Sequence, residues 1–346
     1  PTYRNDITMA ADLIEEVARI YGYDNIPSSL PEMSMTTGKR TDTQAKKHTI
    51  KNVLKDLGLH ETLTYSLTSP SMVDDFNLFH TGETVKLAMP LGEERSVTRK
   101  SIIGSLLQVI NYNQSRNIKD VNIFELSTTY SKDCELQNLA IACTGEYQGL
   151  AYRQISYQAD YYLLKGFVET IFKNIGIEES RYRLERVESD HPYYHPGRSA
   201  YIVINKEIVG IIGNIHPLME KKYGVKNVYV AELNLSAILG LKTGKVKFTA
   251  IPQYPSVSRD IALVMAKDVP AQDVCRKIVQ ASKQLVKETK IFDIYEGEHI
   301  AKGKKSVAIN LVFQDPKKTL DEKTVNEAME RILATVEKEF DAHLRG

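Results

Sequence analysis

The sequence of 346 residues lacks several features that would assign it to a functional class directly. Its three cysteines, Cys134, Cys143 and Cys275, form no Cys-x-x-Cys pair and are odd in number, which argues against a disulfide framework or a structural zinc site. No signal-like start or long uncharged apolar run occurs, since even the stretch 201–215 contains charged residues. These absences favour a cytoplasmic protein without a membrane partner.

Charge of either sign is not in excess. With 45 Lys and Arg against 44 Asp and Glu, the net charge is +1, so a nucleic-acid surface would have to be a local patch. The length and the 42% hydrophobic content allow a substantial core and predict two or more domains. A first residue of Pro1, without a Met, predicts a piece of a longer chain.

Motifs of common enzyme classes are also missing or incomplete. The sequence contains neither a Gly-x-Ser-x-Gly elbow nor a Gly-x-Gly-x-x-Gly loop. Residues 240–246 resemble a phosphate loop, but the glycine spacing is one residue short and Val246 replaces the Mg2+-binding hydroxyl, so a linker is favoured. His191 and His195 have the spacing of a helical metal pair, but the prolines that follow each of them favour a turn.

The most informative stretch is near the start. Leu13, Val17 and Ile20 recur at helical spacing, and Gly22 supplies a left-handed stop, so a short amphipathic helix is predicted. Pro, Ser, Thr and Gly then dominate residues 27–38, which is the composition of a linker.

Four acids lie in and just before this predicted helix, and two interpretations of them compete. The first is capping, with Asp12 as N-cap and Glu15 at N3 of a capping box. The second is a hard-cation site, because grouped carboxylates repel one another unless neutralised, and Mg2+ prefers oxygen ligands. Asp6 and Glu16 favour the cation, since capping needs neither of them.

Residues 42–241 alternate between helical and strand patterns. The predicted helices are 42–57, 101–116 and 159–175, and the predicted strands are 61–67, 121–130, 137–144, 201–204, 208–212 and 228–233. In the strand 61–67, we expect Leu63, Tyr65 and Leu67 to face inward. Hairpins and helices in this order predict an α+β fold with a largely antiparallel sheet and helices packed on it.

After a Gly- and Lys-containing linker at 242–245, the last part has its own order of elements. We expect strands at 259–265, 286–295, 306–313 and near 343, with helices at 271–282 and 321–340. This β-α-β-β-α-β order is that of the ferredoxin-like fold.

Eight basic residues with aromatic neighbours also occur in this last part. They are Lys287, Lys290, Lys302, Lys304, Lys305, Lys317, Lys318 and Arg345. One interpretation is a solvated face. The other is contact with RNA, because RNA recognition combines phosphate-seeking cations with aromatic rings that stack on bases.

Several of these segments together resemble one family, the beta subunit of bacterial phenylalanyl-tRNA synthetase. The resemblance rests on Asp6-Ile7, the run from Asp12 to Tyr23, Ile26-Pro27, Arg99 to Arg116 leading to Phe124-Glu125-Leu126, His195 to Ala200, Gly210 to Pro217, Tyr254 to Asp260, and Phe313-Gln314 with Thr319-Leu320. It extends from Arg4 to the C-terminus, and the order of its parts is more specific than any single motif.

The resemblance implies three domains. These are the C-terminal end of a small metal-bearing domain at 1–30, a class II aminoacyl-tRNA synthetase-like core at 40–241, and a ferredoxin-fold anticodon-binding domain at 252–346. It also implies that Asp6, Asp12, Glu15 and Glu16 bind Mg2+ at a site shared with an alpha subunit. A Gly-x-Gly-x-x-x-Arg segment for ATP is missing, so we expect a noncatalytic core without catalytic residues.

The implied protein is the C-terminal part of the beta subunit of phenylalanine-tRNA ligase. We expect it to assemble with the catalytic alpha subunit as an α2β2 tetramer. The alpha subunit would use ATP to attach phenylalanine to tRNA(Phe), and this chain would bind the tRNA. The alternative is a non-enzymatic RNA-binding or scaffolding protein with the same folds.

Overall fold

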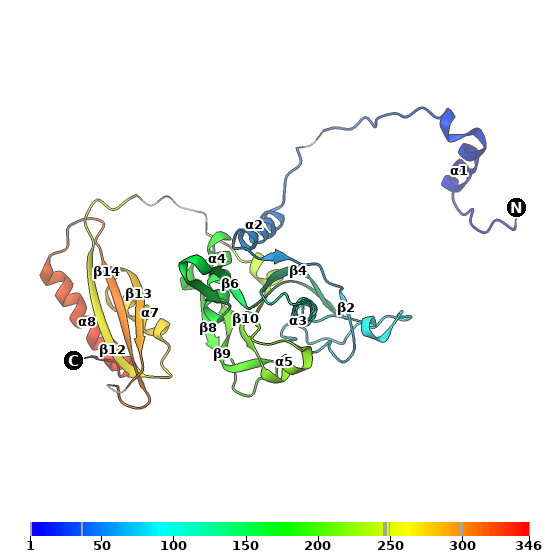
Figure 1. Cartoon of the computed structure of the whole chain (residues 1–346). Coiled ribbons are helices and arrows are strands. Elements are labelled where there is room, and N and C mark those ends of the chain that lie inside the picture. Colours follow the sequence, from blue (N-terminus) through cyan, green and yellow to red (C-terminus); the bar gives the residue numbers. More distant parts are fainter. Residues whose placement is uncertain (1, 36, 245–247, 249, 298–299, 346) are drawn as a thin grey trace. The chain divides into compact units, whose positions relative to one another are not determined.

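The computed structural model of the chain divides into two compact units, Pro1–Val246 and Lys247–Gly346. It describes residues 2–35, 37–244, 248, 250–297 and 300–345 (Figure 1). The helices of the first unit are α1 (Ala10–Tyr21), α2 (Asp42–Asp56), α3 (Ile103–Gln114), α4 (Tyr161–Asn174), α5 (Pro217–Tyr223) and α6 (Leu235–Leu239). Its strands are β1 (His60–Glu61), β2 (Leu67–Thr68), β3 (Val97–Thr98), β4 (Val121–Ser131), β5 (Cys134–Thr144), β6 (Glu146–Leu150), β7 (Ile155–Gln158), β8 (Tyr182–Arg186), β9 (Tyr194–Ile204), β10 (Glu207–Ile215) and β11 (Tyr229–Asn234).

A seven-stranded sheet in the order β1-β4-β5-β11-β10-β9-β8 is the centre of the first unit. Its neighbours are antiparallel except β1 and β4, which run parallel. Helices α2, α4 and α6 bury apolar side chains such as Phe172 against one face of the sheet, and α3 covers the other face with Leu106 and Leu107. This arrangement confirms the predicted α+β fold with a largely antiparallel sheet.

The predicted hairpin between β9 and β10 is confirmed, with a turn one residue shorter than expected. Asn205 and Lys206 both have positive φ, at 52° and 69°, and Ile204 pairs with Glu207 across them. Two left-handed residues in succession give the turn a twist that matches the right-handed twist of the flanking strands.

The predicted strand 61–67 is wrong in both its extent and its facing. Regular pairing ends at Glu61, and Leu63 and Tyr65 are 86% and 64% exposed. Thr64 faces inward instead, because its hydroxyl hydrogen-bonds to charged side chains that are buried beneath it. A buried polar partner has therefore reversed the facing that the apolar alternation predicted.

The second unit has the predicted ferredoxin-like order. Its elements are β12 (Val257–Ala266), α7 (Ala271–Ala281), β13 (Val286–Tyr295), β14 (Lys304–Phe313), α8 (Glu322–Phe340) and β15 (His343–Leu344). The antiparallel sheet has the order β13-β14-β12-β15. Both helices pack on one face, where Ile309 and Leu311 of β14 meet Ile278 of α7 and Ile332 of α8.

The predicted linker at 242–245 precedes this unit, and its last residue, Lys245, lies outside the described residues. No helix among the described residues is long and apolar enough to cross a membrane.

Candidate functional site

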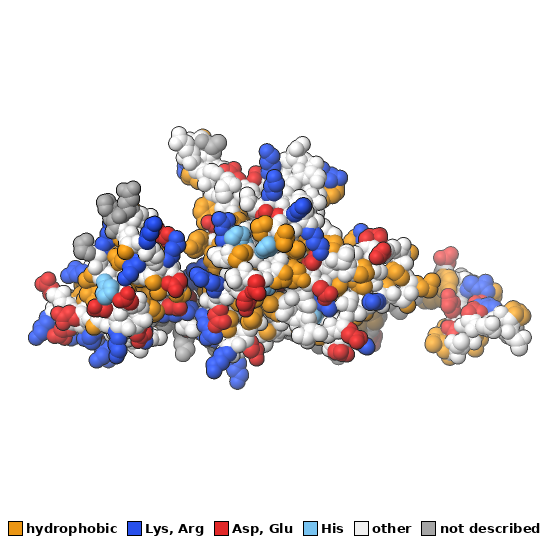
Figure 2. Space-filling model, turned by 90° about the horizontal axis from the view of Figure 1, so that it is seen from below, with side chains coloured by type: hydrophobic (Ala, Val, Ile, Leu, Met, Phe, Trp, Pro, Cys, Tyr) orange, Lys and Arg blue, Asp and Glu red, His pale blue; other side chains and the backbone are white. Residues whose placement is uncertain are grey.

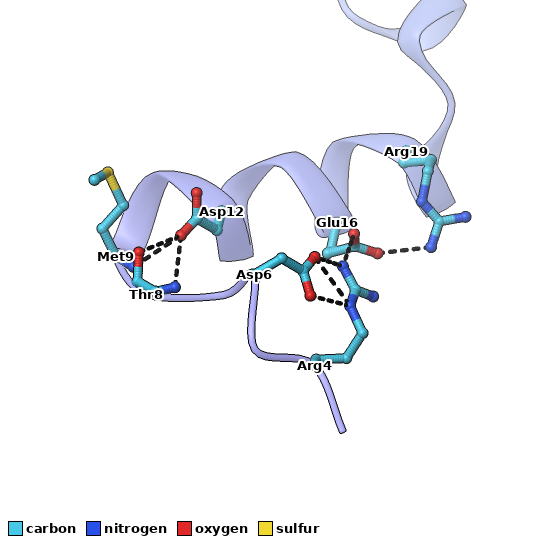
Figure 3. A network of polar contacts seen from close by, with 7 residues as sticks. All are labelled: Arg4, Asp6, Thr8, Met9, Asp12, Glu16 and Arg19. Carbon is cyan, nitrogen blue, oxygen red and sulfur yellow. Dashed lines mark hydrogen bonds and ion pairs between the residues drawn. The ribbon is translucent and has the colours of Figure 1, made fainter. Parts of the chain in front are cut away.

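Arg4 lies between two of the four acids predicted to bind metal (Figure 3). Its Nε donates to Asp6 Oδ1 at 2.9 Å, and its Nη2 donates to Asp6 Oδ2 at 2.7 Å. The same Nη2 donates to Glu16 Oε1 at 2.8 Å, while Arg19 Nη2 donates to Glu16 Oε2 at 2.6 Å. Hydrogen bonds from Arg4 and then Arg19 lower the pKa of Glu16 to about 2. The carboxylate of Glu16 is thus shared between two guanidinium groups.

Asp12 has a different role, and the predicted capping box is wrong in position. The N-cap is Met9, so Asp12 is the third residue of α1. Asp12 Oδ2 accepts hydrogen bonds from the backbone N–H of Met9 at 2.8 Å and of Thr8 at 2.7 Å, and these donors lower the pKa of Asp12. The carboxylate therefore satisfies free N–H groups from inside the first turn of the helix. Glu15, which was expected at N3, is exposed on the next turn.

In this arrangement the four acids do not fit a Mg2+ ion. Such an ion needs several oxygen ligands in nearly octahedral geometry. Asp6 and Glu16 point at a guanidinium, however, and Asp12 points at backbone N–H groups (Figure 3). Among the described residues, no group of three or more His, Cys, Asp and Glu side chains could hold a metal ion. The Mg2+ site therefore stays a prediction, and it requires a different arrangement of these side chains.

A closed triangle of polar side chains lies in the core. Arg99 Nη2 donates to Glu125 Oε1 at 2.7 Å, and both side chains are only 1% exposed. Arg99 Nη1 donates to Thr64 Oγ1 at 2.7 Å, and that hydroxyl donates to Glu125 Oε2 at 2.6 Å. Both carboxylate oxygens of Glu125 and both terminal nitrogens of Arg99 are engaged within the triangle, while Arg99 Nε is buried without a hydrogen-bond partner.

A second buried carboxylate lies on the same face of the sheet. Glu232 accepts hydrogen bonds from Ser101 Oγ at 2.6 Å, from Ile102 N–H at 3.0 Å and from Asn138 Nδ2 at 3.3 Å. Desolvation by burial raises the pKa of Glu232 despite these donors. Nothing in the sequence singled out this residue, because a single acid in an apolar strand carries no spacing signal.

The chain of hydrogen bonds continues to a buried histidine. Asn138 Nδ2 also donates to Thr129 Oγ1 at 3.2 Å, and that hydroxyl lies 2.8 Å from His80 Nε2. His80 Nδ1 is 3.1 Å from Ser131 Oγ. Burial, and then the charge of Lys100, lowers the pKa of His80, which favours the neutral form of the ring. Polar residues on this face of the sheet thus serve as internal structure.

In the second unit, the strand register places the eight predicted tRNA-binding residues at different sites. Lys290 pairs with Asn310 and lies on the sheet face that the helices leave open. Arg345 lies on the same face, with its guanidinium carbon 5.1 Å from the centre of the Tyr295 ring. An exposed cation beside an aromatic ring can meet both phosphates and unstacked bases.

Lys304 and Lys305 are neighbours on β14, so their side chains point to opposite faces of the sheet. Lys305 Nζ donates to the backbone carbonyls of Lys267 at 3.0 Å and Val269 at 2.7 Å. Lys304 lies on the open face, and its Nζ is 3.4 Å from Asp341 Oδ2. The two lysines therefore do not form one patch, and Lys305 supports the loop before α7.

The remaining predicted contacts are exposed but scattered. Lys287 is on the edge strand β13, Lys302 precedes β14, and Lys317 and Lys318 lie between β14 and α8. On the face drawn in Figure 2, Lys and Arg side chains are interspersed with Asp and Glu, as the net charge of +1 leads one to expect. Any RNA surface is thus a local arrangement within a mixed field.

Comparison with known families gives three matches along the chain. The model described as "Phenylalanyl tRNA synthetase beta chain CLM domain" matches residues 26–235. The ferredoxin-fold anticodon binding domain matches residues 252–345, and the tRNA synthetase B5 domain matches residues 1–23. The match at 252–345 confirms the ferredoxin fold predicted for the second unit.

Curated relatives are similar along the whole chain. The protein named phenylalanine--tRNA ligase beta subunit from Bacillus subtilis is 40% identical over 352 aligned residues, which cover 100% of this chain and 43% of the relative. The proteins of the same name from Geobacillus kaustophilus and Staphylococcus saprophyticus are each 38% identical, and cover 100% and 98% of this chain. The chain thus spans less than half the length of these relatives.

Among solved structures, pyrrolysyl-tRNA synthetase from Desulfitobacterium hafniense matches with a TM-score of 0.44 at 14% identity, over 66% of this chain and 74% of that chain. A likeness of this size does not bear on the function. The family model over residues 26–235 covers more than half of the sequence and confirms the resemblance. This chain belongs to the phenylalanyl-tRNA synthetase beta chain family.

Proposed function

We propose that this chain acts as a noncatalytic beta subunit in the attachment of phenylalanine to tRNA(Phe). In this proposal it assembles with a catalytic alpha subunit, as an α2β2 tetramer in the cytoplasm, and the alpha subunit uses ATP. The observation that carries the proposal is the family membership of the core together with its internally paired polar residues. Arg99, Glu125 and Thr64 bind one another in the interior, so the core supports an active partner and does not itself carry out the reaction.

The sheet of the core agrees with a class II synthetase-like scaffold. It is antiparallel apart from the β1 and β4 pair, and it has helices on both faces. The sequence also lacks the Gly-x-Gly-x-x-x-Arg segment that an active class II core needs for ATP. A scaffold of this kind contributes a surface for the alpha subunit and a second domain for the tRNA.

The experiment is a phenylalanine-dependent pyrophosphate exchange assay combined with co-purification. The chain alone is expected to give no exchange above background. With the alpha subunit of the same organism added, it should co-purify as a complex and support activity. Exchange by the chain alone, or failure to bind the alpha subunit, would contradict this function and favour a separate RNA-binding protein.

We also propose that the open sheet face of the second unit contacts tRNA. Lys290, Lys304 and Arg345 lie on this face with Tyr295, while Asp260 on the same face accepts a hydrogen bond from Asn310. Because acids and bases are mixed there, the electrostatic attraction should be modest. Backbone phosphates would position the tRNA, and the half-buried ring of Tyr295 would stack on an unpaired base.

Reversing two charges on this face should weaken tRNA binding. In the full chain, Lys290→Glu with Arg345→Glu removes two phosphate partners. The plot of log K against log salt has a negative slope, and its magnitude should decrease by roughly 0.7 to 0.9 for each phosphate that is no longer neutralised. The measurement is a salt titration of tRNA binding by fluorescence anisotropy. Lys305→Glu is unsuitable, because it would also remove donors from the carbonyls of Lys267 and Val269.

A matched control is available on α8, which covers the opposite face of the sheet. Lys323→Glu with Lys338→Glu changes the net charge by the same amount at exposed helical positions. This pair should leave the salt slope nearly unchanged. An equal loss of affinity in both double variants would indicate a general charge effect and contradict the assignment to the open face.

A further inference from the structure

Arg4 holds two carboxylates that lie ten residues apart in the sequence. Its guanidinium makes a bidentate contact with Asp6, through Nε and Nη2, and a single contact with Glu16 at 2.8 Å. Bidentate pairs between arginine and a carboxylate are directional, because the planar fork of the guanidinium matches the two carboxylate oxygens. Figure 3 shows the guanidinium lying between the two acidic side chains.

The charges in this cluster are compensated within the chain. Asp6 and Glu16 carry two negative charges, and Arg4 and Arg19 supply two positive charges within 3 Å. A divalent cation between Asp6 and Glu16 would have to take the place of the guanidinium, since both groups need the same oxygens. Close approach of a cation to Arg4 would also be repulsive.

We propose that Arg4 is a built-in counter-cation of Asp6 and Glu16, and that a divalent cation can bind these acids only after Arg4 has moved away. The chain then has two exclusive states of the cluster, one closed by Arg4 and one open to a metal ion. This role concerns residues 4–19 alone and does not depend on the proposed ligase function.

The contacts are well placed for such an exchange. The side chains of Arg4 and Asp6 are 34% and 64% exposed, and exposed ion pairs contribute little to stability. Arg4 can therefore leave without a large loss of stability. Glu16 Oε1 is held by Arg4 and Oε2 by Arg19, so the departure of Arg4 frees one carboxylate oxygen for another cation.

The test is a titration of the full chain with Mn2+, followed by electron paramagnetic resonance of the free ion. Arg4→Gln removes the positive charge and the bidentate contact, so Mn2+ should bind about fivefold more tightly than to the wild-type chain, or more. Adding Glu16→Gln to this variant should abolish the gain. Arg19→Gln is the matched control, because it removes an equal charge from the other oxygen of Glu16 and leaves Arg4 in place.

Three results would overturn the proposal. They are no gain in Arg4→Gln, an equal gain in Arg19→Gln, and a gain that survives Glu16→Gln. A second readout, the backbone amide NMR signals of α1 in Arg4→Gln, guards against unfolding of the short helix. The amide signals of α1 should stay in place, and their loss together with no gain in Mn2+ binding would also count against the proposal.

Discussion

Replacing Arg99 with methionine is expected to destabilise the seven-stranded core by about 3–5 kcal/mol. Arg99 and Glu125 are paired at 2.7 Å with both side chains 1% exposed, so removal of the guanidinium leaves the carboxylate buried without its counter-charge. Thr64 also loses a donor, because its hydroxyl accepts from Arg99 Nη1. Removal of a solvent-exposed charge would destabilise the protein far less. The loss in free energy of unfolding therefore reports how deeply the Arg99 and Glu125 pair is buried.

The double variant Arg99→Met with Glu125→Met separates the effect of an unpaired charge from that of poorer packing. It should recover most of the stability, because replacing both ions of a buried pair by apolar residues of similar volume is often neutral or stabilising. Arg95→Met is the control, since Arg95 stacks on the exposed ring of Tyr65 at 3.7 Å and should cost less than about 1 kcal/mol.

Native-state hydrogen exchange is the suitable measurement, because two units can unfold separately and a single melting curve would mix them. Amides of β4 should lose protection in Arg99→Met, while amides of β12 in the second unit should keep theirs and serve as the internal reference. A cost below about 1 kcal/mol in β4, or a double variant as unstable as the single one, would contradict the role of the buried pair.

The regular elements were predictable because their signals are local. Helix α8 carries one apolar stripe, Asp321 accepts from Thr324 N–H at its start, and Asp341 adopts a left-handed conformation at its end. Helix α4 likewise begins after the cap Asp160. Periodicity and caps depend only on residues within a few turns, so no knowledge of the tertiary structure was needed to predict them.

The predictions were wrong where residues far apart in the sequence determine which way a side chain faces or which partner it binds. The facing of this segment depends on the hydrogen bonds of Thr64 with Arg99 and Glu125, which are 35 and 61 residues away in the sequence, and alternation alone gives no information about them. The pairing of Arg4 with Asp6 and Glu16 is likewise a matter of side-chain geometry, whereas the sequence shows only four acids with suggestive spacing. Residue types indicated the region of the candidate site. Whether its carboxylates are neutralised by arginines of the same chain depends on the three-dimensional arrangement of the side chains.

Glu232 offers the second large effect, because two substitutions at this position should act in opposite directions. Its carboxylate is fully buried and accepts from Ser101 Oγ, Ile102 N–H and Asn138 Nδ2. Glu232→Ala leaves these buried donors without an acceptor and opens a cavity, so we expect a cost of about 3 kcal/mol or more. Glu232→Gln keeps the volume, its oxygen can accept from the two N–H donors, and its amide can donate to Ser101.

The pH dependence distinguishes these effects. Burial raises the pKa of Glu232 in the folded state above its ordinary value of 4.5. At a pH between 4.5 and the folded-state pKa, the folded state therefore binds more protons than the unfolded state. Wild-type stability from this group is therefore present below pH 4.5 and is lost as the pH rises through the folded pKa. Glu232→Gln removes that loss, so its free energy of unfolding should equal or exceed that of the wild type at neutral pH. The difference in stability between the two should disappear as the pH approaches 4.5. Urea unfolding at several pH values, followed by exchange of β11 amides, is the measurement. If Glu232→Gln is as destabilised at neutral pH as Glu232→Ala, the core requires the negative charge itself, and burial is not the dominant influence on this carboxyl.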